Sequence, residues 1–311
     1  MSQLIVLMGP TAVGKSKLAL ELANSLNTEI ISADSVQVYK KLDIGSAKIK
    51  EKEKYASDGS YIPHHLIDLV EPDVNFSVAD FQELAAKKIL ELEVQHKCPL
   101  IVGGTGLYIQ ALTELYQFPA IADNLAFRKE MQKKAEERGN AYVHGLLSKI
   151  DQVTANQLHP NNLRRVIRAL EVYEETGKPF SELPKIAKEN ARKSKIFCLL
   201  KPRATLYAEI DQRVEAMLAE GFLQEVKGLL SAGYDLKYKS MQSLGYRQLV
   251  DYLQGVNSYT TAVEAIKQQT RHYAKRQLTW FRRMEQIVYI DLELVKNPLQ
   301  EILDKIPKDN G

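Results

Sequence analysis

Residues 4–16, LIVLMGPTAVGKS, decide the fold of this chain. The apolar run at the start predicts a buried strand, and the rest matches the phosphate-loop pattern G-x-x-x-x-G-K-[ST] between a strand and a helix. In such a loop, backbone N–H groups and the helix N-terminus bind phosphate oxygens, the lysine offsets their charge, and the serine can bind Mg²⁺. We predict a diphosphate site at Gly9, Pro10, Thr11, Ala12, Val13, Gly14, Lys15 and Ser16, with Ser16 as the Mg²⁺ ligand.

Other apolar runs of strand length alternate with helical patterns along the chain. They lie at Glu29–Ser32, Pro99–Gly103, Ile196–Leu200 and Ile287–Ile290. This alternation is typical of an α/β fold with a mostly parallel sheet flanked by helices. We therefore expect an α/β core with a P-loop NTPase-like parallel sheet.

The strand signal disappears between residues 118 and 191, where the sequence predicts only helices, such as Phe127–Arg138 and Asn162–Thr176. Gly177 and Pro179 provide the stop signal of the second helix. After this stretch the strand pattern returns, followed by long helices at Ala208–Leu218 and Thr261–Met284. The predicted organisation is a first core segment (1–117), an all-helical insertion (118–191) and a second core segment with C-terminal helices (192–311).

Composition is that of an ordinary soluble globular protein, with 45% hydrophobic and 26% charged residues and a formal charge of +3. Cys98 and Cys198 each lie in an apolar run, as buried reduced thiols do. No segment approaches the ~20 consecutive apolar residues of a membrane-spanning helix. We expect a cytoplasmic protein with no membrane partner.

Asp34 is the candidate for proton transfer. A nucleotide hydrolase usually has an aspartate after a second apolar strand, where it holds Mg²⁺. Here that strand ends in the glycine-rich turn Gly103–Gly106, and Asp34, in IISADS, is the acid at a strand end near the loop. An aspartate there can accept a proton from an incoming nucleophile, which indicates group transfer; the alternative is a cap of a helix or turn.

Two basic segments indicate a polyanionic partner. Arg164 and Arg168 share a helix face in NNLRRVIRALEVY, although an ordinary solvated face explains them equally well. The segment RHYAKRQLTWFRR, residues 271–283, contains no acid. We expect its stripe of Lys267, Arg271 and Lys275 to follow a phosphate backbone, opposite a buried seam of Ile266, Tyr273 and Trp280; the alternative is a solvent-exposed basic face.

His64 and His65 do not predict a metal site. Adjacent residues in an extended segment point in opposite directions, and no cysteine or third histidine lies near them in the sequence.

In their order along the chain, these motifs resemble those of the tRNA dimethylallyltransferase family, the bacterial-type tRNA isopentenyltransferases. The similar segments are GPTAVGKS (9–16), ISADSVQVYKKLDIGSAK (31–48), PHHLIDLVEP (63–72), FSVADF (76–81), IVGGTGLYIQAL (101–112), HPNNLRRVIRALEVYEETGKPFS (159–181), GFLQEV (221–226), LGYRQL (244–249) and RHYAKRQLTWFRR (271–283). The resemblance runs from Gly9 to Arg283.

This resemblance implies transfer of a dimethylallyl group from dimethylallyl diphosphate to N6 of the adenosine 3′ of the anticodon, with Mg²⁺ as cofactor. The phosphate loop would then hold the prenyl diphosphate, Asp34 would be the general base, Thr105 would lie beside both substrates, and Arg213 would face the diphosphate. The implied partner is the anticodon stem-loop of tRNA, bound by a monomer. The implied tRNA contacts are Asp34, Ser35, Val36, Gln37, Thr105, Arg128, Arg164, Arg165, Val166, Ile167 and Arg168.

Three other functions remain open from the sequence. A small-molecule kinase also combines this loop with a base at a strand end, but normally has a short lid rather than a long insertion. An adenylate isopentenyltransferase would act on free nucleotides and would not need the basic C-terminal helix. An RNA-binding module without catalysis would not need Asp34 or Thr105.

Overall fold

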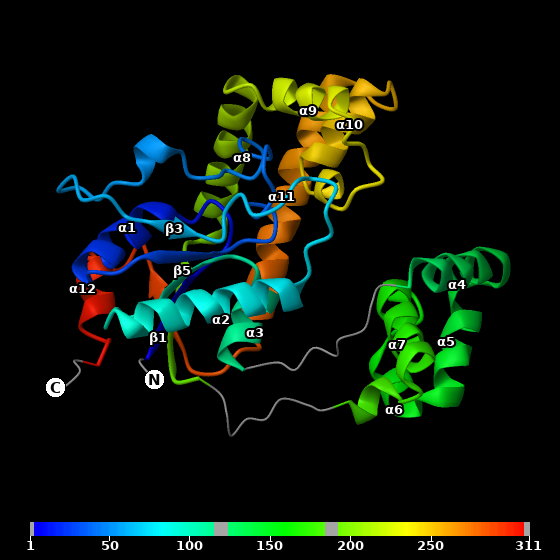
Figure 1. Ribbon diagram of the computed structural model, residues 1–311. Coiled ribbons are helices and arrows are strands. Elements are labelled where there is room, and N and C mark those ends of the chain that lie inside the picture. Colours follow the sequence, from blue (N-terminus) through cyan, green and yellow to red (C-terminus); the bar gives the residue numbers. More distant parts are fainter. Residues whose placement is uncertain (1–2, 115–123, 184–191, 308–311) are drawn as a thin grey trace. The chain divides into compact units, whose positions relative to one another are not determined.

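The computed structural model describes residues 3–114, 124–183 and 192–307 (Figure 1). The chain divides into two compact units, one formed by residues 1–115 together with 190–311 and the other by residues 116–189. The boundary expected at 117/118 lies outside the described residues, and the boundary at 191/192 lies at their edge.

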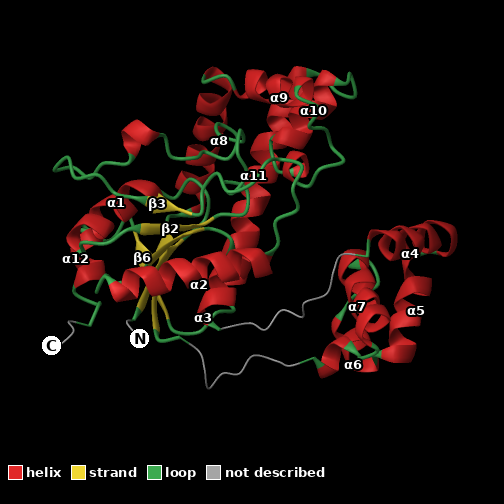
Figure 2. Cartoon of the chain, viewed as in Figure 1, coloured by secondary structure: helices red, strands yellow, loops and turns green. Residues whose placement is uncertain are grey.

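The larger unit contains a six-stranded sheet with the order β3-β2-β4-β1-β5-β6. Its strands are drawn in yellow in Figure 2. Every pair of neighbouring strands is parallel, and Val6 of β1 lies between Ile101 of β4 and Ile196 of β5. The strands are β1 (Leu4–Met8), β2 (Ile30–Ala33), β3 (His64–His65), β4 (Leu100–Gly103), β5 (Ser194–Leu200) and β6 (Ile287–Asp291). The predicted parallel α/β fold is confirmed; sequence analysis missed β3, which is too short to produce a strand pattern.

Helices cover both faces of this sheet. Side chains alternate along β1, so Leu4, Val6 and Met8 enter the core on one face while Ile5 and Leu7 enter the core on the other. The first core is covered by α2 (Val78–Val94), α3 (Gly106–Thr113) and the end of α11 (Tyr259–Phe281). The second is covered by α1 (Lys15–Ser25), α8 (Arg203–Ala219) and α12 (Pro298–Leu303). The chain's first and last helices, α1 and α12, are in contact.

A third hydrophobic cluster joins the far ends of α8 and α11 to two helices that the sequence did not predict. These are α9 (Phe222–Ser231) and α10 (Tyr246–Leu253). The rings of Phe222 and Tyr246 pack edge to face, with centroids 5.0 Å apart. Since the same cluster includes Val38 and Leu42, it holds the segment that follows β2 and Asp34.

The described part of the smaller unit is all helical. It contains α4 (Leu125–Arg138), α5 (Asn140–Ile150), α6 (Gln152–Gln157) and α7 (Leu163–Thr176), and α5 packs against the other three. Its core includes Val143, Leu147, Val166 and Leu170. The predicted helices 127–138 and 162–176 agree with α4 and α7 to within two residues.

Of the two cysteines, only Cys198 is buried. Cys98 is half-buried, and its Sγ donates to the carbonyl of Gln3 at 3.1 Å. The expectation of burial was therefore correct for Cys198 and wrong for Cys98.

Within residues 3–114, 124–183 and 192–307, no helix combines the length and the apolarity that crossing a bilayer requires.

Candidate active site

The phosphate loop connects β1 to α1 and has the backbone shape that anion binding requires. Gly14 adopts φ 99°, a left-handed conformation that glycine accepts without steric cost, and α1 begins at the next residue. Ala12 also has a positive φ, of 65°. The N-terminus of α1 therefore faces the loop, where unpaired amides favour phosphate.

Lys15 lies inside this loop rather than in open solvent. Its Nζ donates to the carbonyl oxygens of Gly9 at 2.8 Å and Pro10 at 2.7 Å. Burial of the ammonium, followed by the positive charge of Arg213, lowers the pKa of Lys15 to about 7, although Asp34 acts in the opposite direction. A phosphate that replaced the two carbonyls would stabilise the charged form.

A cavity of about 600 Å³ opens beside the loop, entirely within the larger unit. This volume is in the range of about 300–1,000 Å³ usual for small-molecule sites. Its lining brings together loop residues, the ends of β2 and β4, and side chains from α8 and α11, including Lys15, Ser16, Asp34, Gly104, Glu209, Arg213, Tyr273 and Gln277.

Asp34 directly follows β2 and lines this cavity. Its Oδ1 accepts hydrogen bonds from the backbone N–H groups of Val36 at 2.8 Å and Gln37 at 3.3 Å. Asp34 therefore caps a turn, the role the sequence had left as an alternative, and at the same time presents a carboxylate to the cavity. One side chain therefore combines the turn cap with a carboxylate that lines the cavity.

Thr105 links the ends of β2 and β4. Its N–H donates to the carbonyl of Ala33 at 3.1 Å, and its Oγ1 accepts from the N–H of Ser35 at 3.1 Å. The phenol of Tyr273 on α11 lies close to Thr105, and burial raises the pKa of Tyr273 far above its usual range. These contacts fix the position of Thr105, which directly follows Gly104, a residue that lines the cavity.

Arg213 reaches the cavity from α8, more than a hundred residues along the chain from the glycine-rich turn. Burial lowers the pKa of its guanidinium, and the negative charge of Asp34 partly offsets that effect. Asp34 and Arg213 are therefore close enough to interact electrostatically, with Lys15 in the same field.

Among the cavity residues that were not predicted as site residues are Glu209, Tyr273 and Gln277. Glu209 carries a buried Oε2 that has no hydrogen-bond partner among the described residues. Tyr273 was assigned to a buried seam with Ile266 and Trp280; only Ile266 is fully buried, and Tyr273 faces the cavity. The spacing of Tyr273 and Gln277, four residues apart on one helix, was the only available signal.

The basic stripe of α11 is not free to follow a phosphate backbone along its whole length. Arg271 binds the carboxylate of Asp211 and Lys267 binds Glu215, both on α8. The charges of Lys267 and Arg271 are therefore paired with acids of α8, and their contact with a phosphate backbone stays a prediction. Lys275 is exposed.

In the helical unit, two expected tRNA-contact arginines surround the fully buried carboxylate of Glu171. Arg128 Nε lies 2.7 Å from Glu171 Oε1, and Arg168 lies 2.6 Å from Glu171 Oε2. Burial opposes ionisation of Glu171, but these arginines and the N–H of Asn124 outweigh it and lower the pKa. The Arg128–Glu171 pair ties α4 to α7, whereas Arg168 and Glu171 lie one turn apart on α7 itself.

The other four residues of the expected tRNA-contact segment 164–168 differ in how exposed their side chains are. Arg164 and Arg165 are exposed, whereas Val166 and Ile167 lie in the core of the helical unit with at most 6% of their surface exposed. Only the two arginines of this four-residue set present side chains to solvent.

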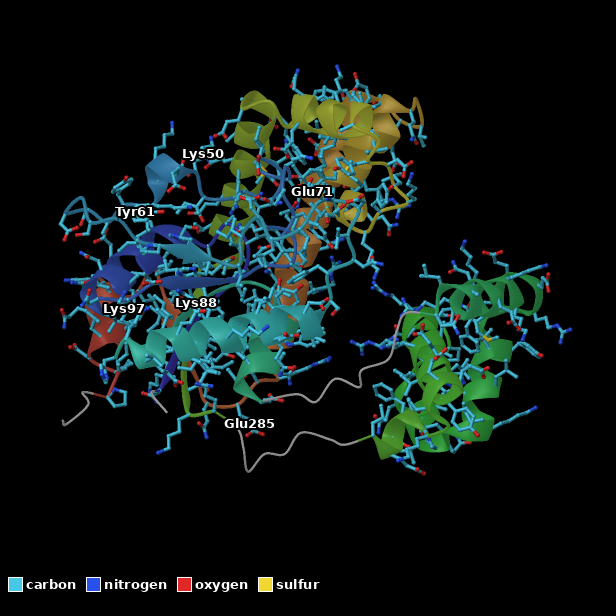
Figure 3. All side chains as sticks on the ribbon, in the orientation of Figure 1. Lys50, Tyr61, Glu71, Lys88, Lys97 and Glu285 are labelled. Carbon is cyan, nitrogen blue, oxygen red and sulfur yellow. The ribbon has the colours of Figure 1, made fainter. Side chains whose placement is uncertain are left out.

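Several other charged side chains of the larger unit form ion pairs within the chain. Lys88 and Lys97, labelled in Figure 3, both bind Glu29, which also contacts His65. His64 lines the active-site cavity and hydrogen-bonds to the carbonyl of Ile62 at 2.8 Å. The two histidines therefore have separate partners, as expected from their adjacent positions in an extended segment.

The fold and this cavity define a P-loop α/β protein whose site combines a phosphate loop, two cations and a carboxylate. A family model described as IPP transferase matches residues 37–284. Since that match covers most of the chain, the chain belongs to the IPP transferase family, and the resemblance seen in the sequence is confirmed.

Individual relatives agree with this assignment. The tRNA dimethylallyltransferase of Halothermothrix orenii is 45% identical over 294 residues, which is 94% of this chain and 88% of that protein. The tRNA dimethylallyltransferase of Bacillus subtilis is 45% identical over 289 residues, 93% of this chain and 90% of that protein.

Solved structures show the same similarity. The tRNA isopentenylpyrophosphate transferase of Bacillus halodurans is 40% identical with a TM-score of 0.71, covering 98% of this chain and 95% of that one. A eukaryotic dimethylallyltransferase acting on tRNA is 28% identical with a TM-score of 0.77, covering 97% of this chain and 78% of that one.

Proposed function

We propose that this enzyme transfers the dimethylallyl group of dimethylallyl diphosphate to N6 of the adenosine 3′ of the anticodon in tRNA. Its family membership makes it a prenyltransferase of the tRNA dimethylallyltransferase type. The observation that carries the site assignment is the convergence of the phosphate loop, Asp34 and Arg213 on one cavity.

The phosphate loop suits a leaving diphosphate. The bond between prenyl C1 and the diphosphate oxygen breaks, so negative charge builds up on that oxygen. Lys15 and Arg213 line the cavity where this charge would develop, and fixed cations in a desolvated site stabilise such a transition state. Gly9–Ser16 supplies amides for the remaining phosphate oxygens.

Asp34 is the proposed general base. The adenine N6 forms a bond to prenyl C1 and loses a proton, which passes to the Asp34 carboxylate. Thr105, fixed between the ends of β2 and β4, would position the acceptor beside the diphosphate. An adenine in a single-stranded loop is inexpensive to extrude from its stack, so it can reach such a cavity.

Ser16 is the proposed protein ligand for Mg²⁺. The cavity offers hard oxygen donors, among them the hydroxyl of Ser16 and Oε2 of Glu209, which has no hydrogen-bond partner among the described residues. Among the described residues no group of three or more Asp, Glu, His or Cys could hold a metal by itself. This donor set suits Mg²⁺, which is commonly bound through few protein ligands, substrate phosphates and water and would neutralise diphosphate charge here.

The proposed tRNA contacts are the segment Asp34–Gln37, Thr105 and the arginines of the helical unit. Arg164 and Arg165 are the arginines best placed for phosphate contact, because they are exposed at the start of α7. Arg128 and Arg168 would act with their charge already partly balanced by Glu171. The monomeric state and the cytoplasmic location remain predictions.

The direct test is product formation. The purified chain, incubated with dimethylallyl diphosphate, Mg²⁺ and unmodified tRNA, should yield isopentenyladenosine 3′ of the anticodon, detected by mass spectrometry of the digested tRNA. Parallel reactions with AMP and with ATP plus small acceptors separate the alternatives. Prenylated AMP, or ATP-dependent phosphorylation without modified tRNA, would overturn the proposal.

A further inference from the structure

Gln277 on α11 joins two segments of the active site that are far apart in the sequence. Its Oε1 accepts from the N–H of Thr11 in the phosphate loop at 2.9 Å, and its Nε2 donates to the carbonyl of Gly104 at 2.9 Å. The residue lies 266 positions from Thr11 and 173 from Gly104, and only 6% of it is exposed. One buried amide therefore bridges the loop that holds phosphate and the turn that contains Thr105.

The chemistry of this bridge requires a side-chain amide. Thr11 contributes a donor and Gly104 an acceptor, so the bridging group must accept at one atom and donate at the other, as a carboxamide does. An apolar side chain would leave both backbone groups without their partner, which is costly in a buried place. A carboxylate at this position would place one of its oxygens against the carbonyl oxygen of Gly104, and neither of these atoms can donate a hydrogen bond.

The glycine-rich turn is shaped around α11. A Cβ added to Gly104 would lie 2.3 Å from Gln277 Nε2, and a Cβ added to Gly106 would lie 2.4 Å from the ring of Trp280. Tyr273, one turn before Gln277, lies close to Thr105 and to Gln277. Three side chains of one helix, at spacings of four and three residues, thus lie against this turn.

We infer that Gln277 is a positioning residue for prenyl transfer, which fixes the distance between the phosphate loop and the turn that carries Thr105. The inference rests on the proposed function, in which the loop holds the leaving diphosphate and the turn lies beside the acceptor. Displacing reacting groups by about 1 Å can cost about 10²-fold in rate. Loss of the bridge should therefore lower kcat more than it raises KM.

The experiment compares Gln277→Met and Gln277→Glu with wild type, measuring isopentenyladenosine formation on tRNA and the melting temperature. Methionine keeps the length of the side chain and removes both hydrogen bonds, so kcat should fall by about 10–100-fold. Gln269→Met, at an exposed position of the same helix, is the matched control and should retain wild-type kinetics.

Gln277→Glu provides a readout that a purely structural role would not move. When its carboxyl is protonated it can accept from Thr11 and donate to Gly104, as the amide does, and when ionised it cannot donate. The activity of Gln277→Glu relative to wild type should therefore rise as the pH falls. The other ionisable side chains of the cavity are present in both proteins, so the ratio of activities reports the change that residue 277 introduces; they include Lys15, Asp34, His64, Lys201, Glu209, Arg213 and Tyr273.

The outcomes distinguish failure of the proposed function from failure of the role inferred for Gln277. If wild type forms no isopentenyladenosine, the proposed function fails. If wild type is active, the inference is overturned by a Gln277→Met enzyme with unchanged kcat, or by a Gln277→Glu activity ratio that does not depend on pH. Should Gln277→Met not fold, Gln277→Glu at low pH still decides, because its neutral form is nearly isosteric with glutamine.

Discussion

Asp34 combines a structural role, the cap of a turn, with its proposed role as general base, and substitution can separate the two. Both hydrogen bonds that it accepts from the backbone go to Oδ1, so asparagine keeps the turn but loses the basicity. We expect Asp34→Asn to lower kcat by about 10²–10⁴-fold, the usual contribution of a general base. Single-turnover assays on saturating tRNA measure this effect.

The matched control is Asp73→Asn, an exposed acid in a loop, which should have wild-type rates. A binding assay on the same proteins should show unchanged tRNA affinity for Asp34→Asn. Full activity in Asp34→Asn would mean that another group accepts the proton.

Lys15 should take up a proton when diphosphate binds. Its pKa is about 7 in the ligand-free protein, and a bound anion raises it. At pH 8 the free lysine is mostly neutral and the bound lysine charged, whereas at pH 6 both are charged. Calorimetry of pyrophosphate binding in buffers of different ionisation enthalpy should therefore show proton uptake by Lys15 at pH 8 that disappears at pH 6.

Lys15→Arg is the reference, since arginine remains charged at both pH values and the protonation of pyrophosphate itself is common to both proteins. Equal proton uptake by wild type and Lys15→Arg at pH 8 would show that Lys15 is already charged in the free loop.

At the scale of single elements, α7 presents two different surfaces from one run of residues. Val166 and Ile167 enter the core, while Arg164 and Arg165 face solvent in the first turn. We expect Arg164→Ala/Arg165→Ala to weaken tRNA binding and to reduce the dependence of log K on log salt by about 1 for each lost phosphate contact. Filter binding across a salt series measures both quantities.

Lys133→Ala removes an exposed cation of α4 in the same unit and should leave the salt slope unchanged. An unchanged slope in the double arginine variant would move the RNA contact of this unit away from the start of α7.

Two basic side chains for which the sequence predicted RNA contact form ion pairs between helices of the larger unit. Lys267 and Arg271 bind acids on α8. A basic helix face therefore predicts RNA contact only after acids on neighbouring helices have been counted.

At the scale of the whole molecule, the two compact units should respond separately to destabilisation. Glu171 is fully buried between Arg128 and Arg168 in the smaller unit. We expect Glu171→Gln to destabilise that unit by about 2–3 kcal/mol, the range for losing charged hydrogen bonds at a buried site. Hydrogen exchange should accelerate in α4 and α7 but not in the sheet.

Pyrophosphate binding should survive in this variant because the phosphate loop belongs to the larger unit, while prenylation of tRNA should fall. Glu174→Gln, an exposed position on the same helix, is the control and should change stability by less than about 0.5 kcal/mol. Uniform acceleration of exchange across the chain would show that the units unfold together.

The sequence by itself determined the features that depend on neighbours along the chain. The phosphate loop, the five longer strands, α4, α7 and α11 all follow from local periodicity and short motifs, because strand and helix patterns repeat within a few residues. The position of Asp34 at a strand end was also predictable, since the carboxyl ends of parallel strands meet at one edge of the sheet.

Tertiary structure alone decided which side chains meet across long separations. The pairing of Arg271 with Asp211, the pairing of Arg128 with Glu171, and the bridge from Gln277 to Thr11 and Gly104 all join residues of different parts of the fold. No periodicity encodes such contacts, because they depend on how helices are placed on the sheet. The phosphate loop and α11 could therefore be predicted from the sequence, whereas the contacts of α11 with that loop and with the glycine-rich turn could not.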